Sequence, residues 1–188
     1  DEKEHSFVLG ISMQNHTPFV APEGYEGTVS YKGGKIANEV ALTKYNTYLS
    51  NLKASDDALK DFIGYLEKRD EPTILLFYGD HYPKINQNGD AYTELGLVTD
   101  LTTPLNDYIT HTTPAFIWSN YKDVGRTDGV VDGSLVSAKL LALTGVEVPN
   151  FMKINNYLEG LKVNAMTNAY LVMNNQFYES GTDEYKRI

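Results

Sequence analysis

The feature that most constrains the fold is an apolar run that two ligand-type residues follow directly. Thr73 to Tyr78 reads TILLFY and is bounded by Pro72 and Gly79, with Asp80 and His81 next in the chain. Strand-forming side chains without polar alternation are typical of a central strand that is covered on both faces. A helical pattern precedes the run, and this order of helix and strand predicts an α/β domain.

Two helices are predicted before this strand. The first, from about Asn38 to Asn51, is indicated by apolar residues at three- and four-residue steps, which one buried helical stripe requires. These residues are Ala41, Tyr45, Tyr48, Leu49 and Leu52. Ser55 is a suitable N-cap for the second helix, since Asp56 and Asp57 would lie beside its positive end. Pro72 prevents the second helix from continuing.

Other elements are predicted around the central strand. Ser6 to Ser12 (SFVLGIS) is an apolar run that suits a buried strand, and Pro114 to Trp118 (PAFIW) suits another. The intervening stretch from Asn86 to Pro104 has the composition of a long loop or an insertion.

The last third of the chain carries clear termination signals. A helix is predicted over roughly Ser134 to Thr144, because Gly145 is a good C-cap residue. The tail after Asn164 alternates in polarity around Asn174 and Asn175, a pair that can turn a hairpin.

Length and charge restrict the class of protein. The chain has 188 residues, which favours one domain or a large piece of one, and 41% of them are hydrophobic. With 16 basic against 25 acidic residues the net charge is −9, which disfavours nucleic acid as a partner. The absence of cysteine excludes disulfides and thiolate metal sites and suits a bacterial extracytoplasmic domain. No run approaches the roughly twenty apolar residues that cross a bilayer.

Asp80 and His81 are the candidate metal ligands. Functional residues of open α/β sheets gather beyond the carboxyl ends of the strands, and Gly79 would let the chain turn there. A carboxylate with an imidazole suits Zn²⁺ or Mn²⁺ better than an all-oxygen Ca²⁺ site. Two ligands do not hold a catalytic metal, so others must come from elsewhere. The alternative is that Asp80 caps a turn and His81 is an ordinary surface histidine, which is the commoner case for a bare Asp-His pair.

His16 is the candidate substrate-binding residue. It lies in Ser12 to Phe19 (SMQNHTPF), in a loop directly after the first predicted strand. Its ring could hydrogen-bond a phosphate oxygen or the leaving oxygen of a substrate. The alternative, which spacing alone favours, is a loop histidine that pairs with the backbone. His111 stands among threonines before the PAFIW strand and is assigned a structural role, with a pocket role as its alternative.

Two of these segments together resemble a known family. MQNHTPF at Met13–Phe19 and FYGDHYP at Phe77–Pro83 closely resemble the lipoteichoic acid synthase-like (phosphoglycerol transferase) branch of the sulfatase and alkaline phosphatase superfamily. The resemblance covers most of Ser6 to Trp118 and is weaker afterwards. Leu140 to Pro149 resembles the superfamily's late helix and glycine, but the aspartate and the Pro-Thr pair usual before that glycine are replaced. Leu135 and Ala138-Lys139 stand in their places.

The resemblance implies a fold and a site. The fold would be α/β, a partial alkaline phosphatase/sulfatase-like fold with a central β-sheet flanked by helices and a small C-terminal α+β tail. Asp80 and His81 would bind a divalent ion, with Mn²⁺ expected and Mg²⁺, Ca²⁺ or Zn²⁺ as alternatives. His16 would line the phosphoglycerol pocket. The family's threonine or serine nucleophile and an earlier acidic ligand lie upstream of the MQNHTPF motif.

We therefore expect residues 1–188 to be the C-terminal portion of a catalytic domain that is inactive by itself, with no catalytic nucleophile. The whole protein is expected to be a metal-dependent phosphoglycerol transferase of cell-envelope polymer synthesis, anchored in the membrane by upstream segments and active outside the cytoplasm. Its substrate would be a phosphoglycerol or sulfate ester. The alternatives are a sulfatase or phosphodiesterase of the same superfamily, and a non-catalytic module that binds envelope glycans. The acceptor and the oligomeric state stay open.

Overall fold

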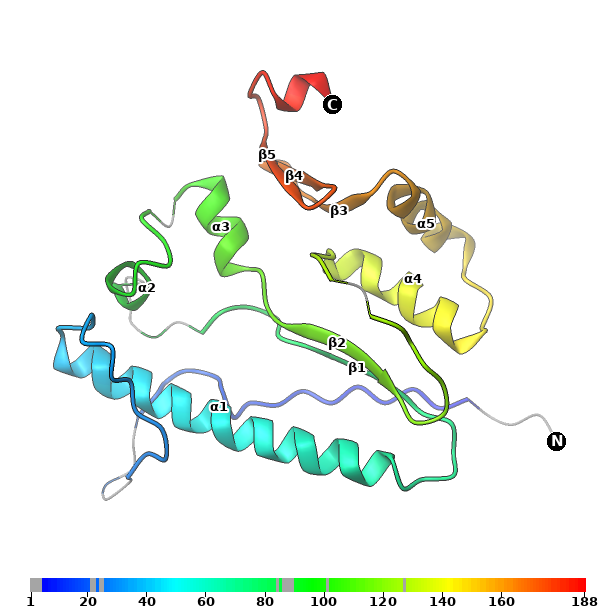
Figure 1. Ribbon diagram of the computed structural model, residues 1–188. Helices are drawn as coiled ribbons and strands as arrows, with labels where there is room; N and C mark the ends of the chain where they lie inside the picture. The colour runs from blue at the N-terminus through cyan, green and yellow to red at the C-terminus, as the bar shows by residue number, and fades with distance from the viewer. Residues whose placement is uncertain are drawn as a thin grey trace. The chain divides into compact units, whose positions relative to one another are not determined.

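Helices and two small antiparallel sheets make up the chain, which confirms the predicted mixed α/β class (Figure 1). The structure, a computed structural model, describes residues 5–20, 23, 26–83, 85, 90–100, 102–126 and 128–188. Two compact units divide it: Asp1–Gly64 with Pro83–Leu97, and Tyr65–Tyr82 with Val98–Ile188. No helix among the described residues is both long enough and apolar enough to span a bilayer.

One long helix, α1 (Glu39–Leu66), replaces the two helices predicted for this region. Asn38 begins it, because its Oδ1 atom accepts a hydrogen bond from Ala41 N at 3.0 Å. Ser55, the predicted N-cap, lies inside the helix, and its hydroxyl donates to Asn15 Oδ1 at 3.3 Å. No glycine or proline separates the two predicted helices. Propagating a helix costs less than nucleating a second one, so the chain continues as a single helix.

Aromatic rings cover the N-terminal half of α1 in the first unit. The ring of Phe19 packs edge-on against Tyr48 at 5.4 Å between centroids, and Tyr31 packs against Tyr45 at 5.6 Å. Ser50, which is buried, accepts a hydrogen bond from Val29 N at 3.2 Å through its hydroxyl. The loop before α1 is therefore fixed on the helix by ring packing and by a hydrogen bond from its backbone to a helix side chain.

A short helix, α2 (Asp90–Glu94), lies within the predicted loop from Asn86 to Pro104. It is attached to the first unit, since Glu94 Oε2 accepts a hydrogen bond from Ala37 N at 3.2 Å and Ala91 is fully buried. Residues 86–89 and 101 of the predicted loop lie outside the described residues.

The strand predicted at Ser6–Ser12 is absent. The segment has no regular secondary structure, and Phe7, Val8 and Ile11 are 82%, 88% and 78% exposed. An extended segment becomes a strand only when a neighbour accepts its hydrogen bonds. Among the described residues, no strand pairs with this segment.

Strands β1 (Ile74–Tyr78) and β2 (Ala115–Ser119) form the first sheet, and both lie within one residue of their predicted ranges. They pair antiparallel, with Ile74 opposite Ser119 and Tyr78 opposite Ala115. The expected cover on both faces is wrong for β1, because the side chains of Phe77 and Tyr78 are exposed. In a sheet of two strands each strand has only one neighbour, so β1 is not the central strand that the sequence pattern predicts.

The rest of the second unit is a run of short elements. Its α-helices are α3 (Pro104–Thr110), α4 (Gly133–Thr144) and α5 (Lys153–Gly160), and its 3-10 helices are η1 (Asn150–Met152) and η2 (Tyr185–Arg187). Its sheet has the order β3 (Val163–Met166), β4 (Tyr170–Met173) and β5 (Gln176–Glu179).

Two local predictions in this region are confirmed, and two helices were not predicted. Helix α4 ends at Gly145, whose φ is 76°, in the left-handed region that favours glycine. The hairpin between β4 and β5 turns at Asn174 and Asn175, with φ values of 57° and 60°. Helices α3 and α5 escaped prediction because each is too short to give a clear apolar period.

An aromatic cluster connects α3 to the second sheet. The ring of Tyr170 lies 5.6 Å from that of Tyr108 and 5.3 Å from that of Phe177. Burial, followed by the nearby carboxylates of Asp107 and Asp132, raises the pKa of the Tyr170 hydroxyl. The cluster fixes α3 in the second unit, and α3 leads directly into β2.

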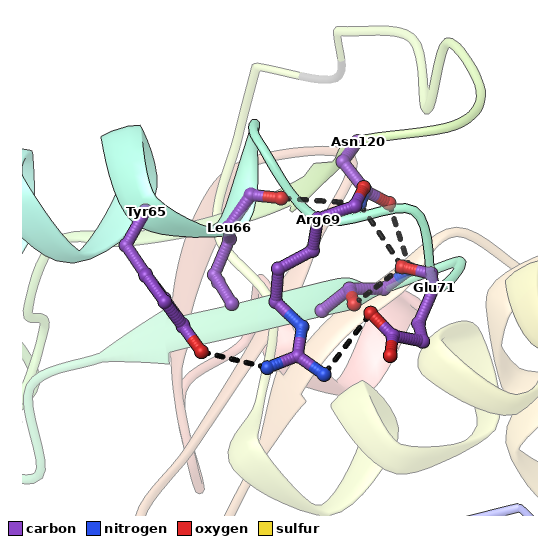
Figure 2. A network of polar contacts seen from close by, with 6 residues as sticks. Tyr65, Leu66, Arg69, Glu71 and Asn120 are labelled. Atoms are coloured by element: carbon purple, nitrogen blue, oxygen red, sulfur yellow. Dashed lines mark hydrogen bonds and ion pairs between the residues drawn. The ribbon is translucent and has the colours of Figure 1, made fainter.

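The Asn120 side chain joins the end of α1 to the start of β1 (Figure 2). Its Nδ2 atom donates to the carbonyl oxygens of Leu66, Arg69 and Glu71 at 3.1, 3.2 and 3.0 Å. Its Oδ1 atom accepts from Thr73 N at 2.7 Å. One amide therefore holds the connection that places β1 beside β2.

Candidate metal and substrate site

Gly79 ends β1 and brings the chain close to the segment before β2. Its N–H donates to Pro114 O at 3.2 Å, and the Thr113 hydroxyl donates to its carbonyl. A Cβ atom at this position would lie 3.0 Å from Thr113 Cβ. Its φ is not in the left-handed region, so the glycine is needed here for the close approach to Thr113.

Asp80 and His81 lie together immediately after Gly79. Asp80 Oδ2 is 3.5 Å from His81 Nε2, and Asp80 Oδ1 accepts a hydrogen bond from His81 N at 2.9 Å. His81 Nδ1 is 2.8 Å from Tyr82 O. Because a carbonyl oxygen only accepts, Nδ1 carries a proton, and Nε2 is the ring nitrogen that lies beside the Asp80 carboxylate.

This donor set fits two coordination positions of a divalent ion. A carboxylate oxygen and an imidazole nitrogen are usual ligands, and a backbone hydrogen bond at the other imidazole nitrogen is the usual way to orient a histidine ligand. The side chains of Asp80 and His81 are 82% and 50% exposed, so both can reach an ion from solvent. Over the described ranges, no group of three or more His, Cys, Asp or Glu side chains could hold a metal.

The alternative role of Asp80, as a residue that caps a turn, is also present in the structure. Asp80 Oδ1 caps the neighbouring backbone N–H, as a turn-forming aspartate does. That contact uses one carboxylate oxygen, and the other lies beside the His81 ring. The capping role therefore orients the carboxylate without occupying the oxygen that a metal would need.

His16 is presented by a loop whose neighbouring side chains are anchored. Asn15 accepts the hydrogen bond from Ser55 on α1, and Phe19 is buried against Tyr48. The exposed His16 ring has Nδ1 2.6 Å from Thr17 O, so Nε2 faces away from its own backbone. His16 belongs to the first unit and the Asp80–His81 pair to the second, and its substrate role stays a prediction.

His111 is a third histidine with the same arrangement. It follows α3 as the C-cap residue, with Nδ1 2.8 Å from Asp107 O and 3.2 Å from Asp107 Oδ1. Tyr82 N donates to Thr110 O at 3.3 Å, which joins this segment to the loop that carries His81. The predicted structural role is confirmed for Nδ1. The spacing of four residues between Asp107 and His111 was the available signal for the pair, but it needed the unpredicted helix α3.

Comparison with known proteins gives the family. The sulfatase family model matches residues 1–146. Most of the chain, including both histidine motifs and the first sheet, lies within the match. The chain therefore belongs to the sulfatase family.

Two curated relatives are named for a glucan and for a polysaccharide. A protein of Rhizobium meliloti (strain 1021) that is named for cyclic beta-1,2-glucan modification is 27% identical over 157 residues, which are 80% of this chain and 24% of the relative. The capsular polysaccharide biosynthesis protein RkpI of the same organism is 36% identical over 91 residues, which are 48% of this chain and 14% of the relative. The chain thus spans a quarter or less of these relatives. No solved structure matches it significantly.

Proposed function

We propose that the protein is a metal-dependent phosphoglycerol transferase of the lipoteichoic acid synthase-like branch, which acts on cell-envelope glycans. The carrying observation is the pair of Asp80 Oδ2 and His81 Nε2, 3.5 Å apart and accessible, in a chain of the sulfatase family. The proposed ion is Mn²⁺. The names of the two relatives support a glycan acceptor, and the motif resemblance is the reason to propose an extracytoplasmic, membrane-anchored setting.

In this proposal Asp80 and His81 hold the ion, and their backbone contacts keep both donor atoms on one side of the loop. A bound divalent ion supplies Lewis-acid chemistry: it lowers the pKa of a nucleophile hydroxyl and neutralises charge on the transferring group. The nucleophile and the remaining ligands are contributed by residues outside this chain. His16 accepts a hydrogen bond at Nε2 from a glycerol hydroxyl of the phosphoglycerol group, since its Nδ1 faces Thr17 O.

A sulfatase that hydrolyses sulfate esters is the second candidate, and the family match itself favours it. Both reactions place a tetrahedral, anionic group at the metal. Assays of one protein preparation with a glycerol-phosphate diester and with an aryl sulfate distinguish the two candidate activities. Turnover of the diester alone supports the proposal, whereas turnover of the sulfate alone makes the protein a sulfatase.

The 188-residue chain alone is expected to give no turnover of an aryl phosphodiester with Mn²⁺. Two ligands at an exposed site bind an ion weakly, and the proposed nucleophile is not among these residues. The measurement is release of the aryl group, with the full-length protein as the positive control. Sustained metal-dependent turnover by the chain alone would contradict the proposal that the nucleophile and the remaining metal ligands are supplied by other residues.

Substituting His16 with alanine in the full-length protein is expected to raise KM for the phosphodiester by about 2- to 10-fold, since one hydrogen bond from a neutral hydroxyl contributes about 0.5–1.5 kcal/mol. Steady-state kinetics give KM and kcat, and elemental analysis gives the bound manganese. His5→Ala, an exposed histidine of the same unit, is the matched control. Loss of manganese together with kcat would show that His16 acts as a ligand instead.

A further inference from the structure

Asp107 and His111 form an ordered pair at the end of α3. His111 Nδ1 is 2.8 Å from the carbonyl oxygen of Asp107 and 3.2 Å from its carboxylate Oδ1. Both of these groups accept hydrogen bonds, so Nδ1 is the protonated nitrogen. In the described part of the chain, the hydrogen bonds of the His111 ring all involve Nδ1. The exposed ring therefore offers the Nε2 lone pair to a ligand.

The same segment of backbone borders the Asp80–His81 loop. Gly79 N donates to Pro114 O at 3.2 Å, and Tyr82 N donates to Thr110 O at 3.3 Å. These two contacts enclose Asp80 and His81 on one side and residues 111–113 on the other. His111 is not a member of a metal-binding group among the described residues. The backbone of His111 thus runs beside the loop that carries the proposed metal ligands.

We propose that His111 positions the acceptor alcohol of the transfer reaction, by accepting a hydrogen bond from its O–H group at Nε2. This inference rests on the proposed function. The lone pair selects a hydroxyl donor, because an anionic oxygen offers no proton for it. The ligand class is the hydroxyl group of a polyol or of a glycan. Asp107 fixes the orientation of the ring, as a carboxylate partner does for a working histidine.

A purely structural role for His111 would use only one of its two ring nitrogens. The backbone N–H of His111 caps α3 in every variant, and the additional contact of the ring with Asp107 O needs only the nitrogen at the Nδ1 position. An asparagine amide can place a nitrogen near Nδ1 but has nothing at the Nε2 position, whereas a glutamine amide can reach the Nε2 position and lacks the near nitrogen. His111→Asn and His111→Gln therefore separate the helix cap from the outward nitrogen.

The test uses the full-length protein with Mn²⁺, an aryl glycerol-phosphate diester as donor and glycerol as the acceptor probe. Product analysis gives the ratio of transfer to glycerol over hydrolysis by water. The midpoint of thermal unfolding shows whether the contact between the residue 111 side chain and Asp107 is kept. We expect His111→Asn to lower the ratio about tenfold, as the loss of one hydrogen bond predicts, with a midpoint near that of the wild type. His111→Gln should have a higher transfer ratio than His111→Asn and a lower thermal midpoint than the wild type. His5→Asn is the matched control.

Three outcomes would overturn the inference. The first is an unchanged ratio in His111→Asn, which would leave His111 as a helix cap. The second is wild-type aryl release with no glycerol product. The third is a wild-type protein without metal-dependent aryl release. The second and third outcomes also overturn the proposed transferase, whereas an unchanged ratio in His111→Asn overturns this inference alone, so transfer to glycerol by the wild type distinguishes the two failures.

Discussion

Alanine at Asp80 or at His81 in the full-length protein is expected to lower metal-dependent turnover by about 10³-fold. The ion contributes several kcal/mol to transition-state stabilisation, and each 1.36 kcal/mol corresponds to about tenfold in rate. Either substitution removes one of two donor atoms that lie 3.5 Å apart. The measurements are the initial rate over a manganese titration and the manganese bound per protein.

The controls for this experiment remove the same chemical groups elsewhere. His5→Ala and Asp70→Asn change exposed residues outside the β1 loop and are expected to keep the manganese content and the rate. Because the side chains of Asp80 and His81 are exposed, their loss should not lower the thermal midpoint. Full turnover with bound manganese in the double variant Asp80→Ala/His81→Ala would refute the metal site.

Asn120→Ala is expected to destabilise the second unit by about 2–4 kcal/mol, since several hydrogen bonds are lost and Thr73 N is left without its acceptor. The side chain joins three carbonyl oxygens at the end of α1 to the start of β1 (Figure 2). Urea unfolding of the 188-residue chain measures the change as a shift of the midpoint at constant slope.

Arg69→Ala provides the matched control within the same network. The Arg69 guanidinium donates to the Tyr65 hydroxyl at 2.7 Å and lies 3.1 Å from Glu71 Oε2, at an exposed position. Exposed pairs of this kind contribute at most about 1 kcal/mol. An Asn120→Ala midpoint equal to that of Arg69→Ala would mean that the amide does not hold β1 in place.

The candidate site was recognised from sequence because its signal is local. Asp80 and His81 complete a stretch of nine consecutive residues that begins with the apolar run at Thr73, and their donor atoms need only their own backbone neighbours to be oriented. His111 gave a weaker signal. Its partner Asp107 stands four residues earlier, which has meaning only on a helix, and its place beside the His81 loop depends on pairing with residues about thirty positions away.

By itself, the sequence determined the features that depend on a few adjacent residues: the strand before Gly79, the end of α4 at Gly145, and the hairpin at Asn174 and Asn175. Each follows from side-chain sterics or from the φ values that a residue tolerates. Only the tertiary structure decided whether Ser55 begins a helix, whether Ser6–Ser12 is a strand, and that β1 pairs antiparallel with β2. Those outcomes depend on hydrogen-bond partners and packing surfaces that are distant in the chain, and no local pattern contains them.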